Sequence, residues 1–235
     1  MVPRKSPKLD KKQVAETALR LLNDVGLEGL SLRAIAKELD VQAPALYWHF
    51  KNKQDLLDEM ATEMMRRMAA DWAGMSSGGD EGADWQEALR ARLRGLRGHL
   101  LRYRDGAKVY SGTHFTDLSF AEPMEGNLRM LTAAGFTPAR AARAWFTAYT
   151  YTIGYVIEEQ AMGGRPGGAD GAGGAQGAGG VEGYDLAARA ERLAAYPLAV
   201  EAGWEMFQDQ ERGFEVGLEA VLAGIAVTLR GSGAS

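Results

Sequence analysis

The sequence predicts an all-α fold, with a group of short N-terminal helices followed by a larger group of longer ones. Outside one glycine-rich tract, Leu, Ala, Arg, Glu and Met dominate the composition, and these residues are strong helix formers. Apolar residues recur at helical spacing through most of the chain, and no segment shows the alternation typical of a strand. With 235 residues, of which 46% are hydrophobic, the chain can bury a substantial core.

The N-terminal helices are short and closely spaced. They are predicted over residues 10–25, 32–39 and 43–49. Gly26 can adopt the left-handed conformation that ends the first helix, and Ser31 is a good N-cap for the second. Asp40 tolerates a positive φ in the tight turn that follows, and Pro44 suits the first turn of the third helix.

The rest of the chain predicts longer helices and two loops. After a helix that begins at about Lys53, helices are predicted over residues 85–103, 122–134, 138–162, 185–208 with a break near Pro197, and 211–230. A short segment at 105–112 lies between the helices predicted over 85–103 and 122–134. Residues 76–84 and the glycine-rich tract 163–180 are expected to be loops, the tract a flexible one. The last helix carries more apolar surface than one neighbour needs, so we expect it in an interface.

Composition excludes several classes of protein. The chain has no cysteine, so it has no disulfide framework and no thiolate metal site. No apolar run reaches the ~18 residues of a membrane helix, and the basic N-terminus lacks the apolar region of a signal peptide. We therefore expect a cytoplasmic protein without a membrane partner.

Residues 1–53 contain ten Lys and Arg against six Asp and Glu, whereas the remainder is acidic. This division favours a nucleic-acid partner for the N-terminal end.

Two short helices joined by a tight turn suggest a helix-turn-helix that binds double-stranded DNA. If Val41, Leu46 and Phe50 face inward, the following side chains remain near the outer side: Gln42, Ala43, Ala45, Tyr47, Trp48 and His49. We expect the three rings of this set to be half-buried. Gln42 and Arg33 can bind base edges, and the small residues Ala43, Pro44 and Ala45 can contact thymine methyl groups. Tyr47, Lys51 and Lys53 can contact phosphates, although an ordinary small helical bundle also explains the pattern.

The chain resembles the TetR family of transcriptional regulators. The resemblance rests first on residues 26–61, GLEGLSLRAIAKELDVQAPALYWHFKNKQDLLDEMA, and continues at RDGAKVYSGT, IGYVIEEQ and FEVGLEAVLAGI. It implies a DNA-binding domain at 1–57 and an effector-binding and dimerisation domain at 58–235. The family forms homodimers through a bundle that would here use residues 138–162 and 211–230. Its DNA contacts match Arg33, Gln42, Pro44, Ala45, Tyr47, Trp48, His49 and Lys53, and a small-molecule effector releases the operator.

The resemblance also implies an effector site, with one departure that concerns metal binding. In tetracycline-binding members, a histidine after RDGAKV binds the magnesium of the drug complex, and that position is Tyr110 here. Thr113 and Glu158 match water-mediated metal contacts, and Arg92 and Leu96 match positions beside the drug. A phenol is a poor Mg²⁺ ligand, so we expect no cofactor unless the effector is a tetracycline-like chelate. An export or resistance gene is the implied target.

A flat, partly polar aromatic effector, such as a polyketide-like compound, is the ligand that the sequence favours. The candidate contacts are Arg92, Leu96, Tyr110, Thr113, His114, Phe115, Trp145, Tyr149, Glu158 and Trp204. For any single ring of this set, a place in the core or in the dimer interface is the more common explanation, and it is the set as a whole that favours a ligand site. A DNA-binding regulator without an effector is a second interpretation. An enzyme is not expected, because the chain has three histidines and lacks nucleophile-elbow, zinc-protease and P-loop motifs.

Overall fold

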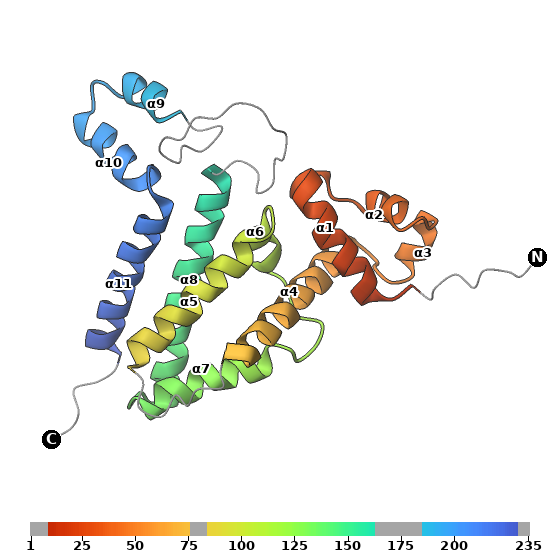
Figure 1. The fold of residues 1–235 in the computed structure, drawn as a ribbon, viewed down its shortest axis with the longest axis horizontal. Coiled ribbons are helices and arrows are strands. Elements are labelled where there is room, and N and C mark those ends of the chain that lie inside the picture. Colours follow the sequence, from red (N-terminus) through yellow and green to blue (C-terminus); the bar gives the residue numbers. More distant parts are fainter. Residues whose placement is uncertain (1–8, 76–83, 163–184, 230–235) are drawn as a thin grey trace, which may run out of the picture.

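The computed structural model describes residues 9–75, 84–162 and 185–229, and every regular element among them is a helix (Figure 1). The N-terminal helices are α1 (Lys11–Gly29), α2 (Leu32–Glu38), α3 (Ala43–Tyr47) and α4 (Lys53–Met75). They are followed by α5 (Trp85–Leu101), α6 (Gly106–Tyr110), α7 (Ala121–Ala133), α8 (Pro138–Met162), α9 (Leu186–Arg192), α10 (Pro197–Phe207) and α11 (Gln210–Thr228). The predicted all-α fold is confirmed. Residues 76–83 and 163–180, predicted as loops, lie outside the described residues.

Local signals determine where the N-terminal helices begin and end. The Ser31 hydroxyl accepts a hydrogen bond from the Ala34 N–H at 3.2 Å, which confirms the predicted N-cap of α2. Asp40 has a φ of 52°, as predicted for the turn. Gly26 has the expected positive φ of 69°, but its ψ of 175° is not that of a left-handed helix. The chain therefore kinks at Gly26 and continues as helix to Gly29.

The third helix is shorter than predicted. It ends at Tyr47 rather than at His49, because the N–H groups of His49 and Phe50 both bind the carbonyl of Leu46 and tighten the last turn. Leu46 and Phe50 are fully buried and Val41 is partly buried, which confirms the predicted inward set.

The helix α4 joins the N-terminal head, which comprises α1 to α3, to the rest of the molecule. It packs on α1 at one end and on α6 farther along, and Figure 1 shows it running between the two parts. Its buried residues Leu56, Met60, Met64 and Met68 belong to one hydrophobic cluster that extends from Val14 to Val156. The predicted domain boundary at residues 57 and 58 falls inside this helix and stays a prediction.

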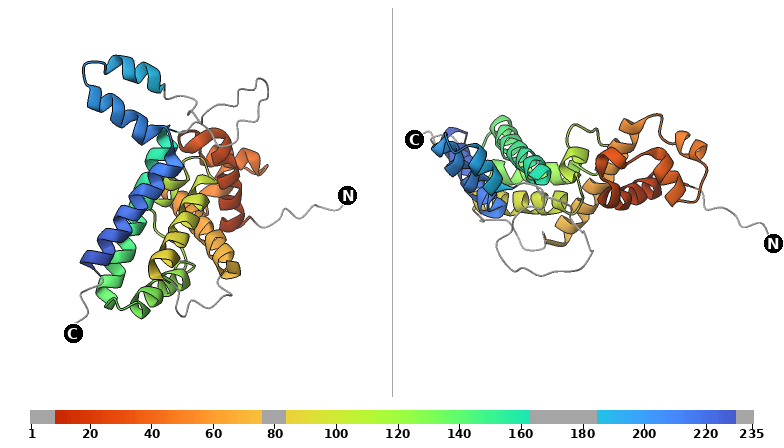
Figure 2. Two further views of the ribbon diagram at one scale, coloured as in Figure 1. Left: turned by 60° about the vertical axis from the view of Figure 1, so that its left-hand side comes forward. Right: turned by 90° about the horizontal axis from the view of Figure 1, so that it is seen from above.

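The larger part is arranged around α8. Helices α5, α7 and α11 pack against it, and the two views in Figure 2 show α11 lying along it. The predicted helix over 185–208 is observed as α9 and α10, which separate before Pro197 and pack on each other, and α10 also packs on α11. The predicted helix at 85–103 ends at Leu101, and the 105–112 segment contains α6. None of the helices described is both long and apolar enough to cross a membrane.

Tyrosine hydroxyls join α8 to α11. Tyr151 donates to the carbonyl of Phe214 at 2.8 Å, and Tyr155 donates to the carbonyl of Gln210 at 2.9 Å. The hydroxyls fit because glycines lie opposite them. A Cβ atom on Gly217 would lie 2.1 Å from the Tyr151 hydroxyl oxygen, closer than real contacts allow.

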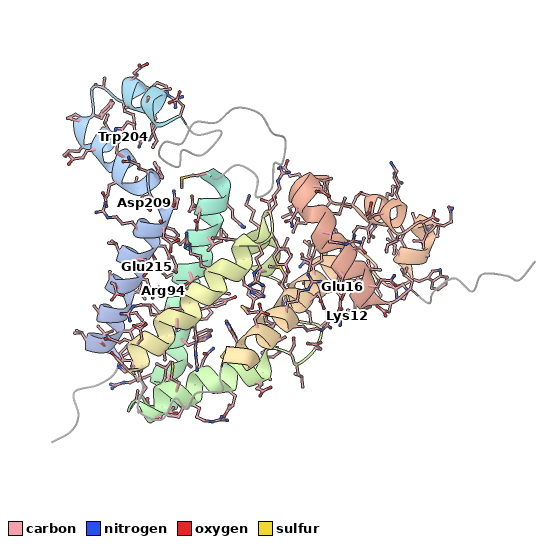
Figure 3. All side chains as sticks on the ribbon, viewed as in Figure 1. Lys12, Glu16, Arg94, Trp204, Asp209 and Glu215 are labelled. Carbon is pink, nitrogen blue, oxygen red and sulfur yellow. The ribbon has the colours of Figure 1, made fainter. Side chains whose placement is uncertain are left out.

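Arginines of α5 add ion pairs to the same helix pair. Arg94 binds Glu215 of α11 at 2.6 Å, and both are labelled in Figure 3. The buried Arg97 binds Glu159 of α8 at 2.7 Å and also binds Glu211 of α11, with its guanidinium over the ring of Phe214. Because Arg97 is buried and bidentate to Glu159, loss of either side chain would leave a buried charge without its partner.

We expect Gly217→Ala to lower the free energy of unfolding by about 1–3 kcal/mol, because the added methyl group forces Tyr151 away from the Phe214 carbonyl. Chemical denaturation followed by circular dichroism measures this loss. Gly98→Ala on α5 is the matched control: apart from the backbone of its own helix, no atom of the described residues lies within 4 Å of the added Cβ, so this substitution should stabilise the protein by about 0.5–1 kcal/mol. Equal effects of the two substitutions would contradict the packing argument.

His99 on α5 is buried beside charged groups of two helices. Its Nδ1 lies 3.6 Å from an Asp71 carboxylate oxygen on α4, which also binds Arg102 at 2.9 Å, and its Nε2 has no hydrogen-bond partner among the described residues. Burial lowers the pKa of His99 below its ordinary 6.5, and the cations Arg102 and Arg67 lower it further against the opposing effect of Asp71. The folded protein therefore holds His99 neutral.

His99 should make folding sensitive to acid. Since its folded pKa lies below the unfolded value of 6.5, the unfolded chain binds more protons, and stability is lost as the pH falls below 6.5. Urea denaturation at about pH 7.5 and 5.5 should show a larger loss for the wild type than for His99→Leu. His114→Gln, which changes an exposed imidazole, should keep the wild-type loss. An unchanged pH dependence in His99→Leu would refute the assignment.

Candidate nucleic-acid interface and effector site

The predicted DNA contacts occupy the outer side of α2 and α3. Arg33, Gln42 and Pro44 are exposed, and the Tyr47 side chain keeps 51% of its surface accessible. Ala43, Ala45 and His49 are partly buried beside them. Because Leu46 and Phe50 anchor the helix from below, the outer side chains form one surface that can enter a groove. Their role in binding DNA stays a prediction.

Trp48 differs from the expectation of a half-buried ring. Its side chain is 88% exposed, because α3 has already ended at Tyr47 and Trp48 lies in the turn that follows. An indole in this position presents its face and its N–H to an approaching molecule rather than to the core. Such exposure is uncommon for tryptophan in a monomer and favours a contact surface.

The lysines near this surface are held in different ways. Lys53 donates from Nζ to the Leu27 carbonyl at 2.8 Å, so it ties α4 to the end of α1 and keeps further N–H groups for a phosphate. Lys51 has an exposed side chain in the turn that caps α4. Lys11 of α1, which is not among the predicted DNA contacts, places its ammonium 5.8 Å from the centre of the Phe50 ring. No local signal marks Lys11, because its neighbour lies 39 positions away.

An aromatic cluster forms where α4, α6 and α8 meet. Tyr110 and Phe115 pack edge to face with centroids 5.6 Å apart, and Phe115 stacks on Phe120 at 5.5 Å. Tyr149 of α8 packs against the same hydrophobic cluster, and its ring lies 6.1 Å from that of Trp145. Phe115, Phe120 and Tyr149 are partly exposed, so the cluster reaches the surface. Flat aromatic molecules bind well to such rings.

The phenol of Tyr110 is the least accessible polar group of this aromatic cluster. The residue is 5% exposed, and its hydroxyl donates to the Met65 sulfur of α4 at 3.2 Å. Burial raises the pKa of Tyr110 well above its usual value, and the neighbouring Tyr149 raises it further. Burial also raises the pKa of Tyr149 to about 12. Both phenols are therefore protonated donors at neutral pH.

The structure gathers some of the predicted effector residues and separates others. Leu96, Tyr110, Phe115 and Tyr149 share one cluster, and Trp145 adjoins it through Tyr149. Arg92 of α5 donates to the buried Asn127 of α7 at 2.6 Å. Glu158 and the His114 side chain are exposed, and Trp204 lies on α10, at the far end from the head in Figure 3. As effector contacts, all of them stay predictions.

The side chains near Tyr110 are not suitable ligands for a magnesium ion. A neutral phenol that already donates to a sulfur offers little to a hard cation, and Thr113 donates its hydroxyl to the Tyr110 carbonyl at 2.9 Å. Glu158 is exposed to solvent on α8. In the parts of the chain that the structure describes, no group of three or more His, Cys, Asp or Glu side chains could hold a metal ion.

Hydrogen bonds fasten the segment after Tyr110 to α4. The N–H groups of His114 and Thr116 donate to the side chains of Asp58 and Thr62 at 3.1 and 2.8 Å. The Thr116 hydroxyl donates to the buried Glu59 at 2.8 Å. These bonds connect the segment that leaves the aromatic cluster to the helix that leads into the head.

A second connection joins the head to the corner between α5 and α6. The Leu27 N–H donates to Asp105 at 3.0 Å, and the Arg104 N–H donates to the Asn23 side chain at 2.8 Å. Asp105 has a φ of 56°, which is uncommon for a residue other than glycine. The head is thus held to the body at α4 and at this corner, which lies beside α6.

Comparisons with known proteins agree with this arrangement. The sequence profile described as "Bacterial regulatory proteins, tetR family" matches residues 14–60, and the profile "Tetracyclin repressor-like, C-terminal domain" matches residues 78–229. The class D tetracycline repressor protein of Escherichia coli is 35% identical over 227 residues, which cover 94% of this chain and 91% of that protein.

Solved structures show the same fold. A possible TetR family transcriptional regulator from Streptomyces coelicolor superposes with a TM-score of 0.73 at 35% identity, covering 93% of this chain and 99% of its own. A TetR variant from Acinetobacter baumannii in complex with minocycline gives a TM-score of 0.66 at 33% identity, covering 96% of this chain and all of its own. The matches extend over both the head and the larger helical part.

Tyr47→Phe should lower the affinity for DNA from upstream of the protein's own gene about three- to tenfold, because one hydrogen bond to a phosphate is lost. Fluorescence anisotropy with labelled DNA measures the change. Tyr196→Phe removes the hydroxyl of another exposed tyrosine, between α9 and α10, and should leave the affinity unchanged. An equal loss in both variants would show that Tyr47 has no specific part in binding.

Proposed function

Since the chain belongs to the TetR family of bacterial transcriptional regulators, we propose that it is a homodimeric repressor whose operator is palindromic and whose effector binds at the aromatic cluster. The observation that carries this proposal is the outer surface of α2 and α3, with its exposed Arg33, Gln42, Tyr47 and Trp48 on a firmly buried base. A protein of this family acts on DNA rather than as an enzyme. Its place of action would be the cytoplasm, where bacterial DNA lies.

The proposed dimer uses the outer faces of α8 and α11. Large apolar side chains are exposed there, including Phe146 on α8 and Val216 and Val227 on α11. Gly154 on α8 and Ala220 on α11 are small residues that are also exposed. Two helices with such faces pack well against a second pair to form a four-helix bundle. The symmetry of the resulting dimer would place two heads on successive turns of a DNA palindrome.

Release of the operator follows from the proposed effector site. A ligand at Tyr110, Phe115 and Tyr149 would contact α6, α8 and the segment fastened to α4. It would favour release only if it binds better to the head orientation that does not fit DNA. We propose an export or resistance gene as the regulated target, and a flat aromatic compound as the effector.

Ala220→Arg should convert the dimer to monomers and lower operator affinity at least about tenfold, because a charge would be buried in the bundle and the two heads would bind independently. Light scattering after size exclusion gives the mass, and anisotropy on upstream DNA with one or two half-sites gives the affinity. The wild type should strongly prefer two half-sites.

The control is Ala133→Arg, which adds the same charge at an exposed position of α7. It should keep both the dimer and the affinity. A wild-type protein that is monomeric, or that binds one half-site as tightly as two, would refute the dimeric mode of binding. Failure to bind any upstream fragment would refute the proposed function itself.

A further inference from the structure

The hydrogen bond between Tyr110 and Met65 joins a strong donor to a weak acceptor. A phenol O–H donates well, whereas a thioether sulfur accepts poorly. The bond is 3.2 Å long and buried, and Tyr110 belongs to α6 while Met65 belongs to α4. Replacing the sulfur with a better acceptor therefore makes the hydrogen bond of the buried phenol more favourable.

The surroundings of this phenol favour an uncharged acceptor. Among the described residues, the Tyr110 side chain contacts the Met65 sulfur and the Phe115 ring and lies near Tyr149, and none of these three groups is charged. The hydroxyl of Thr113 is committed to the Tyr110 carbonyl. Since the Tyr110 pKa is raised by burial, the phenol does not ionise to attract a cation. None of these three groups carries a charge that would offset the desolvation of an anionic ligand.

We propose that the effector is a neutral, flat aromatic molecule with a carbonyl oxygen, such as a quinone or an aryl ketone, bound without a metal ion. Its carbonyl takes the Tyr110 hydrogen bond from Met65, and its rings pack against Phe115 and Tyr149. This inference rests on the proposed function, and it specifies the chemistry of the ligand at the same site.

When the Tyr110 hydroxyl bonds to the ligand instead of Met65, a contact between α6 and α4 is lost, and α4 is the helix that enters the head. Met65 lies on α4 between the buried Met64 and the ion-paired Arg66, on the helix that enters the DNA-binding head. When Tyr110 turns to the ligand, α6 loses its side-chain hydrogen bond to α4. The ligand therefore acts on the helix that leads to the head without contacting the head itself.

Menadione, a small neutral naphthoquinone, and methylnaphthalene, its carbonyl-free counterpart, test this proposal by calorimetry on the full chain without DNA. The chain has no cysteine, so the thiol addition typical of quinones does not interfere. The wild type should bind menadione about five- to tenfold more tightly than methylnaphthalene, as expected for one hydrogen bond. Tyr110→Phe should abolish this preference. Met65→Leu should increase the menadione affinity, because the competing acceptor is gone while the size of the side chain is kept.

Chelation separates this proposal from a metal-dependent site. Menadione binding should be the same in EDTA and in Mg²⁺, and tetracycline should gain no affinity from Mg²⁺. Equal or absent binding of the two probes, a preference that survives Tyr110→Phe, or dependence on Mg²⁺ would each overturn the proposal. Operator binding measured without any ligand tests the proposed function separately. A protein that binds its operator but ignores the carbonyl would thus refute the ligand chemistry alone.

Discussion

The continuous hydrophobic core along α4 is the constraint on which the rest of the structure depends. One side of this helix is buried in the head and then in the body, through Leu56, Met60, Met64 and Met68. A core that spans both parts prevents the head from moving independently. A rotation of the head relative to the body would expose apolar surface to water, which costs about 25 cal/mol of free energy per Å². Motion at the effector site and orientation of the head are therefore coupled through packing, and the polar contacts of Asp58, Thr62 and Asp105 set the resting position.

The sequence was sufficient to predict those helix ends and turns that depend on one residue and its immediate neighbours. The Ser31 cap, the turn at Asp40 and the break before Pro197 each depend on one residue and its immediate neighbours, and each is observed. The early end of α3 could not be predicted in this way, since the carbonyl of Leu46 binds two N–H groups at once. The exposure of Trp48 follows from that end, and so it was missed as well.

The candidate site was less accessible to sequence reasoning because its contacts are distant along the chain. Tyr110 and Met65 are 45 positions apart, and no spacing rule connects a tyrosine on a short helix to a methionine on a long one. Helical periodicity identifies the apolar side of α8 but does not say which ring faces α6. The resemblance to a family supplied the position of Tyr110, and only the three-dimensional arrangement supplied its hydrogen-bond partner.

The hydrogen bonds between α8 and α11 have a consequence for gene control when a cell contains few copies of this protein. Tyr151 and Tyr155 fix the two helices within one chain, so each subunit brings a finished surface to the proposed dimer and needs no further folding to associate. Such subunits can exchange and persist singly when dilute. At those concentrations the concentration of the proposed dimer rises as the square of the concentration of chains. A cell in which the concentration of this protein falls to half would then keep about one quarter of the dimers, and the controlled gene would respond steeply to the level of the protein.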